Sequence, residues 1–147
     1  MIGLDTNVLV RALTDDDPEQ SPLARDFMRS LTPGEPGFVS LTALVETWWV
    51  LRRDVHYRYA REQVHQVVEA LLDNTAIVME NADAVRAAAA TAAETGRELP
   101  DVLIATQGRR AGCTATVTFD HRATAIPGMR LLEPTTPPGD EADAAAG

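Results

Sequence analysis

The sequence predicts an α/β protein whose central, mainly parallel sheet of four to five strands is covered by helices on both faces. Two observations predict this class. Short apolar, β-branched runs recur along the chain, and segments with helical periodicity separate them. Strands that alternate with helices are joined by right-handed crossovers, which place the strands parallel and the helices on the faces of the sheet.

The expected strands are short apolar runs between polar or turn-forming residues. Four are clear, and the run "MRLL" near the end predicts a short fifth strand. They cover residues 2–5, 37–40, 76–79, 115–119 and 129–132.

The helices are predicted from capping residues and from apolar spacing. In "DPEQ", Asp17 is a cap residue, Pro18 occupies the first helical position and Gln20 follows three residues after the cap. Further helices are indicated by "LTALVETWWVLRR", by "ADAVRAAAATAAE" and by "PDVLIATQGRRAG", which Gly112 ends. One more follows the i, i+3, i+4, i+7, i+8 pattern of an amphipathic helix at Val64, Val67, Val68, Leu71 and Leu72.

Length and composition indicate one domain, residues 1–133, followed by a tail. The tail, residues 134–147, is rich in Pro, Gly, Ala and acidic residues, so we expect it to be disordered. A single cysteine, Cys113, excludes an internal disulfide and suits a reducing compartment. No apolar run approaches the roughly 18 residues of a membrane span and no basic leader precedes the first strand, so we expect a cytoplasmic protein without a membrane partner.

The net charge of −9 argues at first against a nucleic-acid partner. Its distribution weakens that objection, because three of the acids lie in the tail and four more are candidate metal ligands. All 13 basic residues are arginine, which binds phosphate bidentately but whose abundance equally fits a bias in genomic base composition.

Two acids stand at the ends of predicted strands. Asp5 ends the first strand, and Asp120, in "TVTFDHR", ends the fourth. In an open parallel sheet, ligands bind beyond the carboxyl ends of the strands, so these carboxylates are expected to meet on one edge. Each also has a structural explanation, Asp5 as a helix cap and Asp120 as a turn residue.

Two further acids are unusual for their surroundings. Glu46 lies in "LTALVETWWVLRR", where nearly every neighbour is apolar, so we expect it to be buried and to need a positive partner. Asp101 follows Pro100 in the first turn of its helix, where the helix dipole alone is a sufficient reason for an acid. Several carboxylates that share a site need a cation to stay ionised. All-oxygen ligands favour Mg²⁺ or Mn²⁺, whose common use is hydrolysis at phosphate.

Four stretches in order, "GLDTNVLVR", "ALVETWWVL", "PDVLIAT" and "TVTFDHRA", resemble the PIN-domain family, and more narrowly the VapC-type ribonuclease toxins of bacterial toxin–antitoxin pairs. The resemblance runs from Met1 to about Leu132. It implies a three-layer α/β/α fold and a Mg²⁺- or Mn²⁺-dependent endoribonuclease. It also implies two partners besides the RNA substrate, a cognate antitoxin protein and a second copy of the chain in a homodimer.

The resemblance also implies roles for individual residues. Asp5, Glu46, Asp101 and Asp120 match the family's catalytic, metal-binding acids. Of the supporting residues, Thr6 and Asn7 match the polar pair that orients the first acid, and Thr118 matches a hydroxyl that lines the site. A further acid of many relatives is replaced here by Arg122, so a second metal would be less well supplied; Glu98 could help, although an exposed loop acid is the simpler reading. The implied mechanism is in-line attack on phosphorus by metal-activated water, leaving a 5′-phosphate and a 3′-hydroxyl.

The segment "LRRDVHYRYAR" combines arginine with tyrosine, the mixture expected where single-stranded RNA binds. A solvated loop between two helices, with arginines that complement a helix end, explains it as well. The candidate RNA-binding residues are Arg52, Arg53, Tyr57, Arg58 and Arg61.

Two other functions compete with the nuclease. A haloacid-dehalogenase-type phosphatase also begins with a strand-terminal Asp, but it needs D-x-D, and Asn7 stands in the second place. A non-catalytic RNA- or protein-binding module on the same fold is the stronger rival, although such relatives lose acids and this chain keeps all four.

Overall fold

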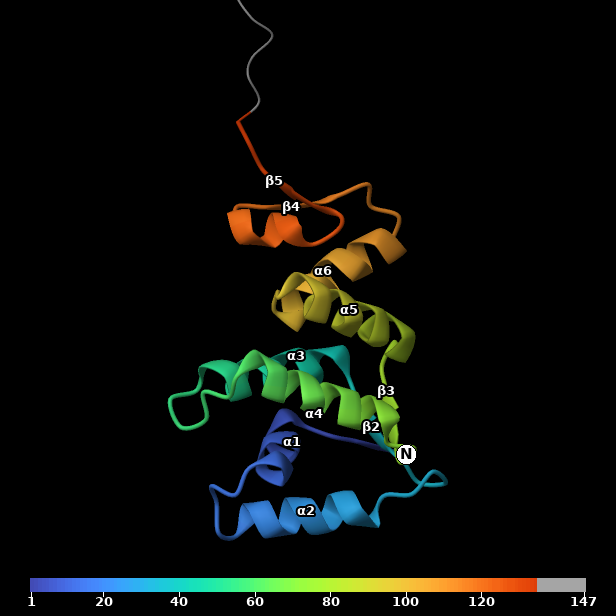
Figure 1. Ribbon diagram of the computed structural model, residues 1–147. Coiled ribbons are helices and arrows are strands. Elements are labelled where there is room, and N and C mark those ends of the chain that lie inside the picture. The colour runs from blue at the N-terminus through green and yellow to red at the C-terminus, as the bar shows by residue number, and fades with distance from the viewer. Residues whose placement is uncertain (135–147) are drawn as a thin grey trace, which may run out of the picture.

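A computed structural model describes residues 1–134, so the predicted tail lies, from residue 135 onward, outside the described residues. The five strands and the helices appear in the predicted order (Figure 1). The strands are β1 (Ile2–Gly3), β2 (Gly37–Val39), β3 (Ile77–Met79), β4 (Thr116–Thr118) and β5 (Met129–Leu131). The helices are α1 (Thr6–Leu13), α2 (Gln20–Ser30), α3 (Leu41–Arg53), α4 (Arg61–Asp73), α5 (Ala82–Thr95) and α6 (Leu99–Arg110), with a 3₁₀ helix, η1 (His121–Ala125).

The α2 helix begins later than its capping residues predict. The Asp17 carboxylate accepts hydrogen bonds from the backbone N–H groups of Glu19 and Gln20, at 2.9 and 2.7 Å. Asp17 therefore caps the chain as expected, but Pro18 and Glu19 form a turn and regular helix starts only at Gln20.

The predicted α/β class with parallel strands is confirmed, but the five strands are divided between two sheets. The first has the order β1-β2-β3, with Ile2 paired to Gly37 and Gly37 paired to Ile77. The second holds only β4 and β5, with Thr116 paired to Met129. Both sheets are parallel throughout.

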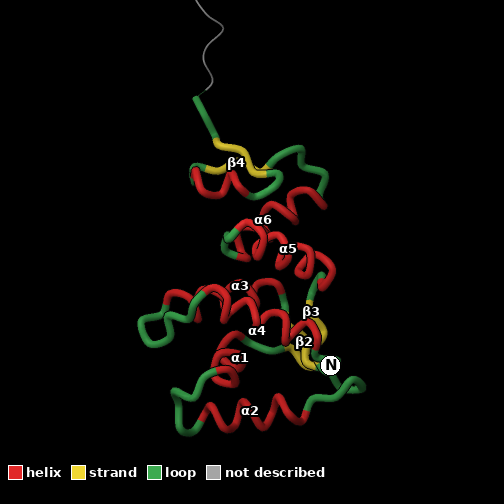
Figure 2. Tube along the Cα trace, in the orientation of Figure 1, coloured by secondary structure: helices red, strands yellow, loops and turns green. Residues whose placement is uncertain are grey.

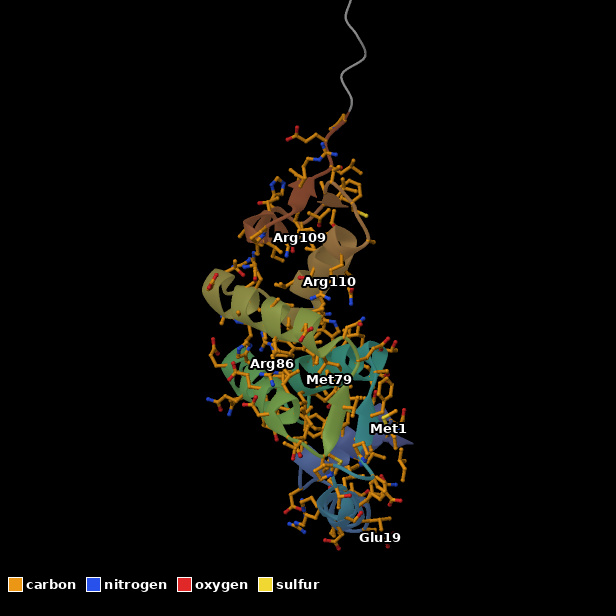
Figure 3. All side chains as sticks on the ribbon, turned by 90° about the vertical axis from the view of Figure 1, so that its right-hand side faces the viewer. Met1, Glu19, Met79, Arg86, Arg109 and Arg110 are labelled. Carbon is orange, nitrogen blue, oxygen red and sulfur yellow. The ribbon has the colours of Figure 1, made fainter. Side chains whose placement is uncertain are left out.

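The helices and sheets follow one another along an elongated molecule. In Figures 1 and 2, α1 and α2 lie at the bottom, and α3 and α4 lie beside the three-stranded sheet. The α5–α6 pair comes next, and β4 and β5 lie at the far end. Figure 3, turned by 90°, places Met1 in the lower part and Arg109 and Arg110 in the upper part, in agreement with this order.

One apolar core joins the three-stranded sheet to the helices from α3 to α6. Trp48, Leu51 and Leu99 are at most 1% exposed within it. A Cβ at Gly37 would lie 2.8 Å from Leu31 and 2.9 Å from Leu4, so glycine allows β2 to approach both side chains closely. None of the helices between residues 1 and 134 is long and apolar enough to cross a membrane.

A polar cluster joins the end of α1 to the α3–α4 loop, and it predicts a pH-dependent contribution to stability. Asp16 accepts hydrogen bonds from the Tyr57 hydroxyl and, at 2.8 Å, from Thr14, and it pairs with Arg11 at 2.6 Å. The Tyr57 bond above all, with the Thr14 and Arg11 bonds, lowers the pKa of Asp16 from 3.8 to about 2.

Because this pKa is lower in the folded state, the contribution is complete above the unfolded value of 3.8 and is lost as the pH falls toward about 2. We expect Asp16→Asn to lower the urea midpoint at pH 6, with the difference from the wild type shrinking between pH 4 and pH 2. A difference that is the same at pH 6 and pH 2 would contradict the role of this carboxylate.

Candidate functional site

Asp5 and Glu46 are the first of two pairs of acids, linked through Thr6, which follows Asp5 in the chain and donates a hydrogen bond to Glu46. Asp5 occupies the N-cap position of α1, where its backbone oxygen accepts from Val8 and Leu9, but its side chain makes no capping hydrogen bond. The buried Thr6 donates its hydroxyl proton to Glu46 Oε2 over 3.1 Å. The capping explanation therefore does not account for the Asp5 carboxylate, which is exposed and has no hydrogen-bond partner within residues 1–134.

The prediction that Glu46 is buried is wrong. The α3 helix packs Ala43, Leu44, Thr47, Trp48 and Leu51 into the core, and Glu46 lies on its other face with an exposed side chain. The buried residues of this helix thus lie on a different face from the Glu46 side chain. Its partner is also different from the expected cation, because Thr6, predicted to orient Asp5, binds Glu46 instead.

Asp101 and Asp120 form the second pair. Asp101 lies half-buried in the first turn of α6, and Asp120 follows β4 at the start of η1. Burial and then the negative charges of Asp120 and Glu98 raise the pKa of Asp101, against the opposing charges of Arg53 and Arg97. A half-buried carboxylate with a raised pKa experiences an excess of negative potential, which a bound cation would neutralise.

Asp120 is held in a turn by local hydrogen bonds. Its carboxylate accepts from the Arg122 N–H at 2.8 Å, and its own N–H donates to Thr118 Oγ1 at 3.0 Å. The Thr118 hydroxyl therefore orients the backbone at Asp120. Thr118 was expected to line the site, and it lies beside this candidate acid. Asp120 is thus a turn residue, and it can still be a metal ligand, because its second carboxylate oxygen makes none of these bonds.

The two pairs do not meet in one chain. Within residues 1–134, no group of three or more His, Cys, Asp and Glu side chains is close enough to hold a metal ion. The four predicted ligands are all carboxylates, and this donor chemistry fits Mg²⁺ or Mn²⁺. Within residues 1–134, however, the side-chain positions do not gather three of these donors into one cluster.

Glu98 is not the exposed loop acid that the sequence suggests. It accepts hydrogen bonds from Trp48 Nε1 at 2.8 Å and from Arg52 Nη2 at 2.5 Å. Burial alone would raise the pKa of Glu98, but the bonds from Arg52 and Trp48 outweigh it and lower the pKa. The side chain therefore fastens the start of α6 to α3 and is not available as a metal ligand.

The candidate RNA-binding residues fall into two groups. Arg52 is held by Glu98 and donates to the Tyr59 carbonyl, and Tyr57 is bound to Asp16 and stacked on Tyr59, so these side chains have structural partners. Arg53 lies 3.7 Å above the Trp49 ring and is exposed. The exposed Arg58, which has a φ of 45°, and the half-buried Arg61, which pairs with Glu62, complete the set.

One acid at a strand end was missed. Glu80 directly follows β3, and its carboxylate accepts from the Leu41 N–H at the start of α3, at 2.7 Å. The signal was present, since an apolar run followed by an acid is the same pattern that singled out Asp5 and Asp120. Its bond to a helix N-terminus explains its charge without a metal.

The chain therefore combines an α/β framework of parallel strands with acids at strand ends and at a helix start. Comparison with known families shows which family has this arrangement. The family model of the PIN domain matches residues 2–129. The chain therefore belongs to the PIN-domain family, whose members are generally nucleases that use divalent metal ions. No curated protein sequence matches the chain.

Proposed function

We propose that the chain is a Mg²⁺- or Mn²⁺-dependent endoribonuclease and the toxin of a type II toxin–antitoxin pair. The observation that carries this proposal is Asp101 in a chain of the PIN family: it is half-buried, and burial and then the charge of Asp120 raise its pKa. An acid with a raised pKa is costly for the fold alone when it is ionised, and a divalent ion would remove that cost. When bound, such an ion activates water and neutralises charge at the phosphate.

The chain's own residues then hold the ion and the substrate. Asp5, Glu46, Asp101 and Asp120 are the proposed ligands, and Thr6 fixes one carboxylate oxygen of Glu46 by its hydrogen bond. Arg53 on the Trp49 ring is the best-placed side chain for the RNA backbone, because it is exposed and its charge lies on the same helix as Glu46. The proposed partners are RNA and a cognate antitoxin in the cytoplasm.

The proposal is tested by incubating the purified protein with total RNA in the presence of Mg²⁺, Mn²⁺ or EDTA. We expect cleavage with either metal, none with EDTA, and products with 5′-phosphates whose ends map to defined sites. Asp5→Asn is the inactive control, since Asp5 makes no capping bond that its loss would break. Metal-independent cleavage would refute the mechanism, and intact RNA under all conditions would favour the non-catalytic binding module.

A further inference from the structure

A cavity with charged walls lies between α4 and α5, which pack against each other (Figure 1). Its volume is about 310 Å³, and none of the four candidate metal ligands lines it. On the α5 side the wall includes alanines, whose small side chains leave room for a ligand. The charged and titratable side chains of the wall are Arg61, Glu62, His65 and Glu69 of α4 and Arg97, which follows α5.

The two arginines have unused hydrogen-bond donors. Arg97 Nε donates to the Thr95 carbonyl over 3.3 Å, and the terminal nitrogens of Arg97 have no hydrogen-bond partner among residues 1–134. Arg61 Nη2 pairs only with the adjacent Glu62, at 3.2 Å. An exposed ion pair of this kind contributes little to stability, so Arg61 can exchange it for another anion at small cost.

The acids of the wall do not cancel the positive charge of the arginines. The side chains of Glu62 and Glu69 are 73% and 59% exposed, so water solvates their charges. The Arg61 side chain is 34% exposed and Arg97 is half-buried. Charges that are partly withdrawn from water act more strongly than solvated ones, so the cavity favours an anionic ligand.

A structural explanation accounts for only one of the arginines. The C-terminal end of a helix attracts a cation, and Arg97 follows the end of α5 at Gly96. The same explanation does not require a second arginine, from another helix, on the wall of the same cavity. It also leaves the terminal nitrogens of Arg97 without a role.

The cavity adjoins the Asp101 side of the candidate site. Arg97 stands four residues before Asp101, and its positive charge opposes the rise in the pKa of Asp101. The charge of Arg61 likewise helps to lower the pKa of Glu98, the residue at the start of α6. An RNA chain with one phosphate at Asp101 would therefore pass close to both arginines.

We propose that this cavity, the Arg61–Arg97 pocket, binds a phosphate group of the RNA chain other than the one that is cleaved. The inference rests on the proposed function and adds a substrate-positioning site to it. The planar guanidinium group of arginine binds phosphate oxygens through two parallel hydrogen bonds. Phosphate contacts fix the position of a nucleic acid without reading its bases, so the pocket holds RNA of any sequence.

The salt dependence of RNA binding tests the pocket without a measurement of cleavage. A labelled oligouridylate of about 12 nucleotides is titrated with the full chain in EDTA, from about 50 to 200 mM NaCl, and binding is followed by fluorescence anisotropy. Each phosphate contact of a single strand adds about 0.7 to the slope of log affinity against log salt. The double variant Arg61→Gln/Arg97→Gln should lose about 0.7 of this slope and bind about 5-fold more weakly at about 0.1 M NaCl.

The double variant Arg29→Gln/Arg86→Gln is the matched control, because it removes the same number of positive charges. Arg86 joins the same two helices elsewhere, through Asp73 of α4 at 3.1 Å, and Arg29 pairs with Asp26 on α2. Neither arginine lines the pocket. The control should therefore keep the slope of the wild type.

Two further variants separate phosphate binding from a structural role and do not depend on how the glutamine variant folds. Arg61→Lys/Arg97→Lys keeps both charges and should keep the slope. Glu62→Gln frees Arg61 from its ion pair, so RNA should bind up to about 5-fold more tightly, as expected for an exposed pair. A purely structural role predicts no gain in affinity from Glu62→Gln.

A wild type that does not bind the oligouridylate, an unchanged slope in the glutamine variant, or a Glu62→Gln protein that binds no more tightly would each overturn the proposed pocket. The proposed function is judged separately, by cleavage with Mg²⁺ or Mn²⁺. RNA binding with the expected slopes but without cleavage would refute the nuclease and leave the pocket standing. Cleavage by a protein whose RNA binding does not depend on Arg61 and Arg97 would refute the pocket alone.

Discussion

Asp101→Asn is expected to abolish metal-dependent RNA cleavage while leaving the metal-free protein at least as stable as the wild type. A metal ligand contributes several kcal/mol to the stabilisation of charge at the phosphate, so the cleavage rate should fall at least about 100-fold. The measurements are cleavage of a labelled RNA under saturating Mg²⁺ and thermal unfolding in EDTA. Most substitutions of a half-buried side chain destabilise a protein. An Asp101→Asn protein that is as stable as the wild type in EDTA would therefore be a result specific to this site.

The expected stability follows from the sign of the pKa shift. Burial and the charges of Asp120 and Glu98 raise the pKa of Asp101, so the folded state disfavours its ionised form. At neutral pH the carboxylate therefore opposes folding, and this cost disappears as the pH falls below the unfolded value of 3.8. The neutral amide removes the cost at every pH. A variant that cleaves RNA like the wild type would exclude Asp101 as a ligand, and a large loss of stability in EDTA would show that the carboxylate is structural.

Asp26→Asn is a matched control for this experiment. Asp26 is exposed on α2, and the structure pairs it with Arg29 at i+3 and with none of the four acids. An exposed ion pair of this kind contributes little to stability, so neither cleavage nor the melting temperature should change appreciably.

The short strands could be predicted from the sequence because each depends on local pattern. The run at residues 76–79, for example, produces β3 with Ile77 and Met79 buried. The pairing of the strands was not predictable in this way. It depends on contacts between residues that are distant in the sequence, such as the hydrogen bond from Trp48 of α3 to Glu98 before α6, which are fifty residues apart.

In the candidate site, too, some features could be predicted from the local sequence and others depend on contacts between distant residues. Asp5 and Asp120 were found because a charge directly after an apolar strand is visible in the sequence itself. The environment of Glu46 was misjudged, because its apolar neighbours along the chain point into the core while its own side chain faces out. The partner of Thr6 was also unpredictable, since the two residues that share this hydrogen bond are forty positions apart.

The second large expected effect is a loss of stability on substitution of Trp48, which is adjacent to Trp49. Neighbouring positions on a helix point about 100° apart, so only one of them can lie in the core. Trp48 is that residue, being 1% exposed, whereas Trp49 is half-buried beneath Arg53. The indole N–H of Trp48 also donates to Glu98, which joins α3 to the start of α6.

Trp48→Ala is expected to lower the free energy of unfolding by about 3–5 kcal/mol, because it leaves a large cavity and removes a hydrogen bond to a charged group. Since domains of this size are typically stable by about 5–15 kcal/mol, much of the margin would be lost. Urea unfolding followed by circular dichroism measures the change. Trp48→Phe fills most of the cavity but lacks the N–H, so its cost should be nearer about 1.5–3 kcal/mol.

Trp49→Ala provides the comparison at the neighbouring position, with the same change of side chain. It removes a half-buried ring and a cation–π contact, and the contact itself contributes only about 0.5–1 kcal/mol at an exposed site. The Trp49 variant should therefore unfold at a clearly higher urea concentration than the Trp48 variant. Equal losses at the two positions would contradict the assignment of Trp48 to the core and its role in joining α3 to the start of α6.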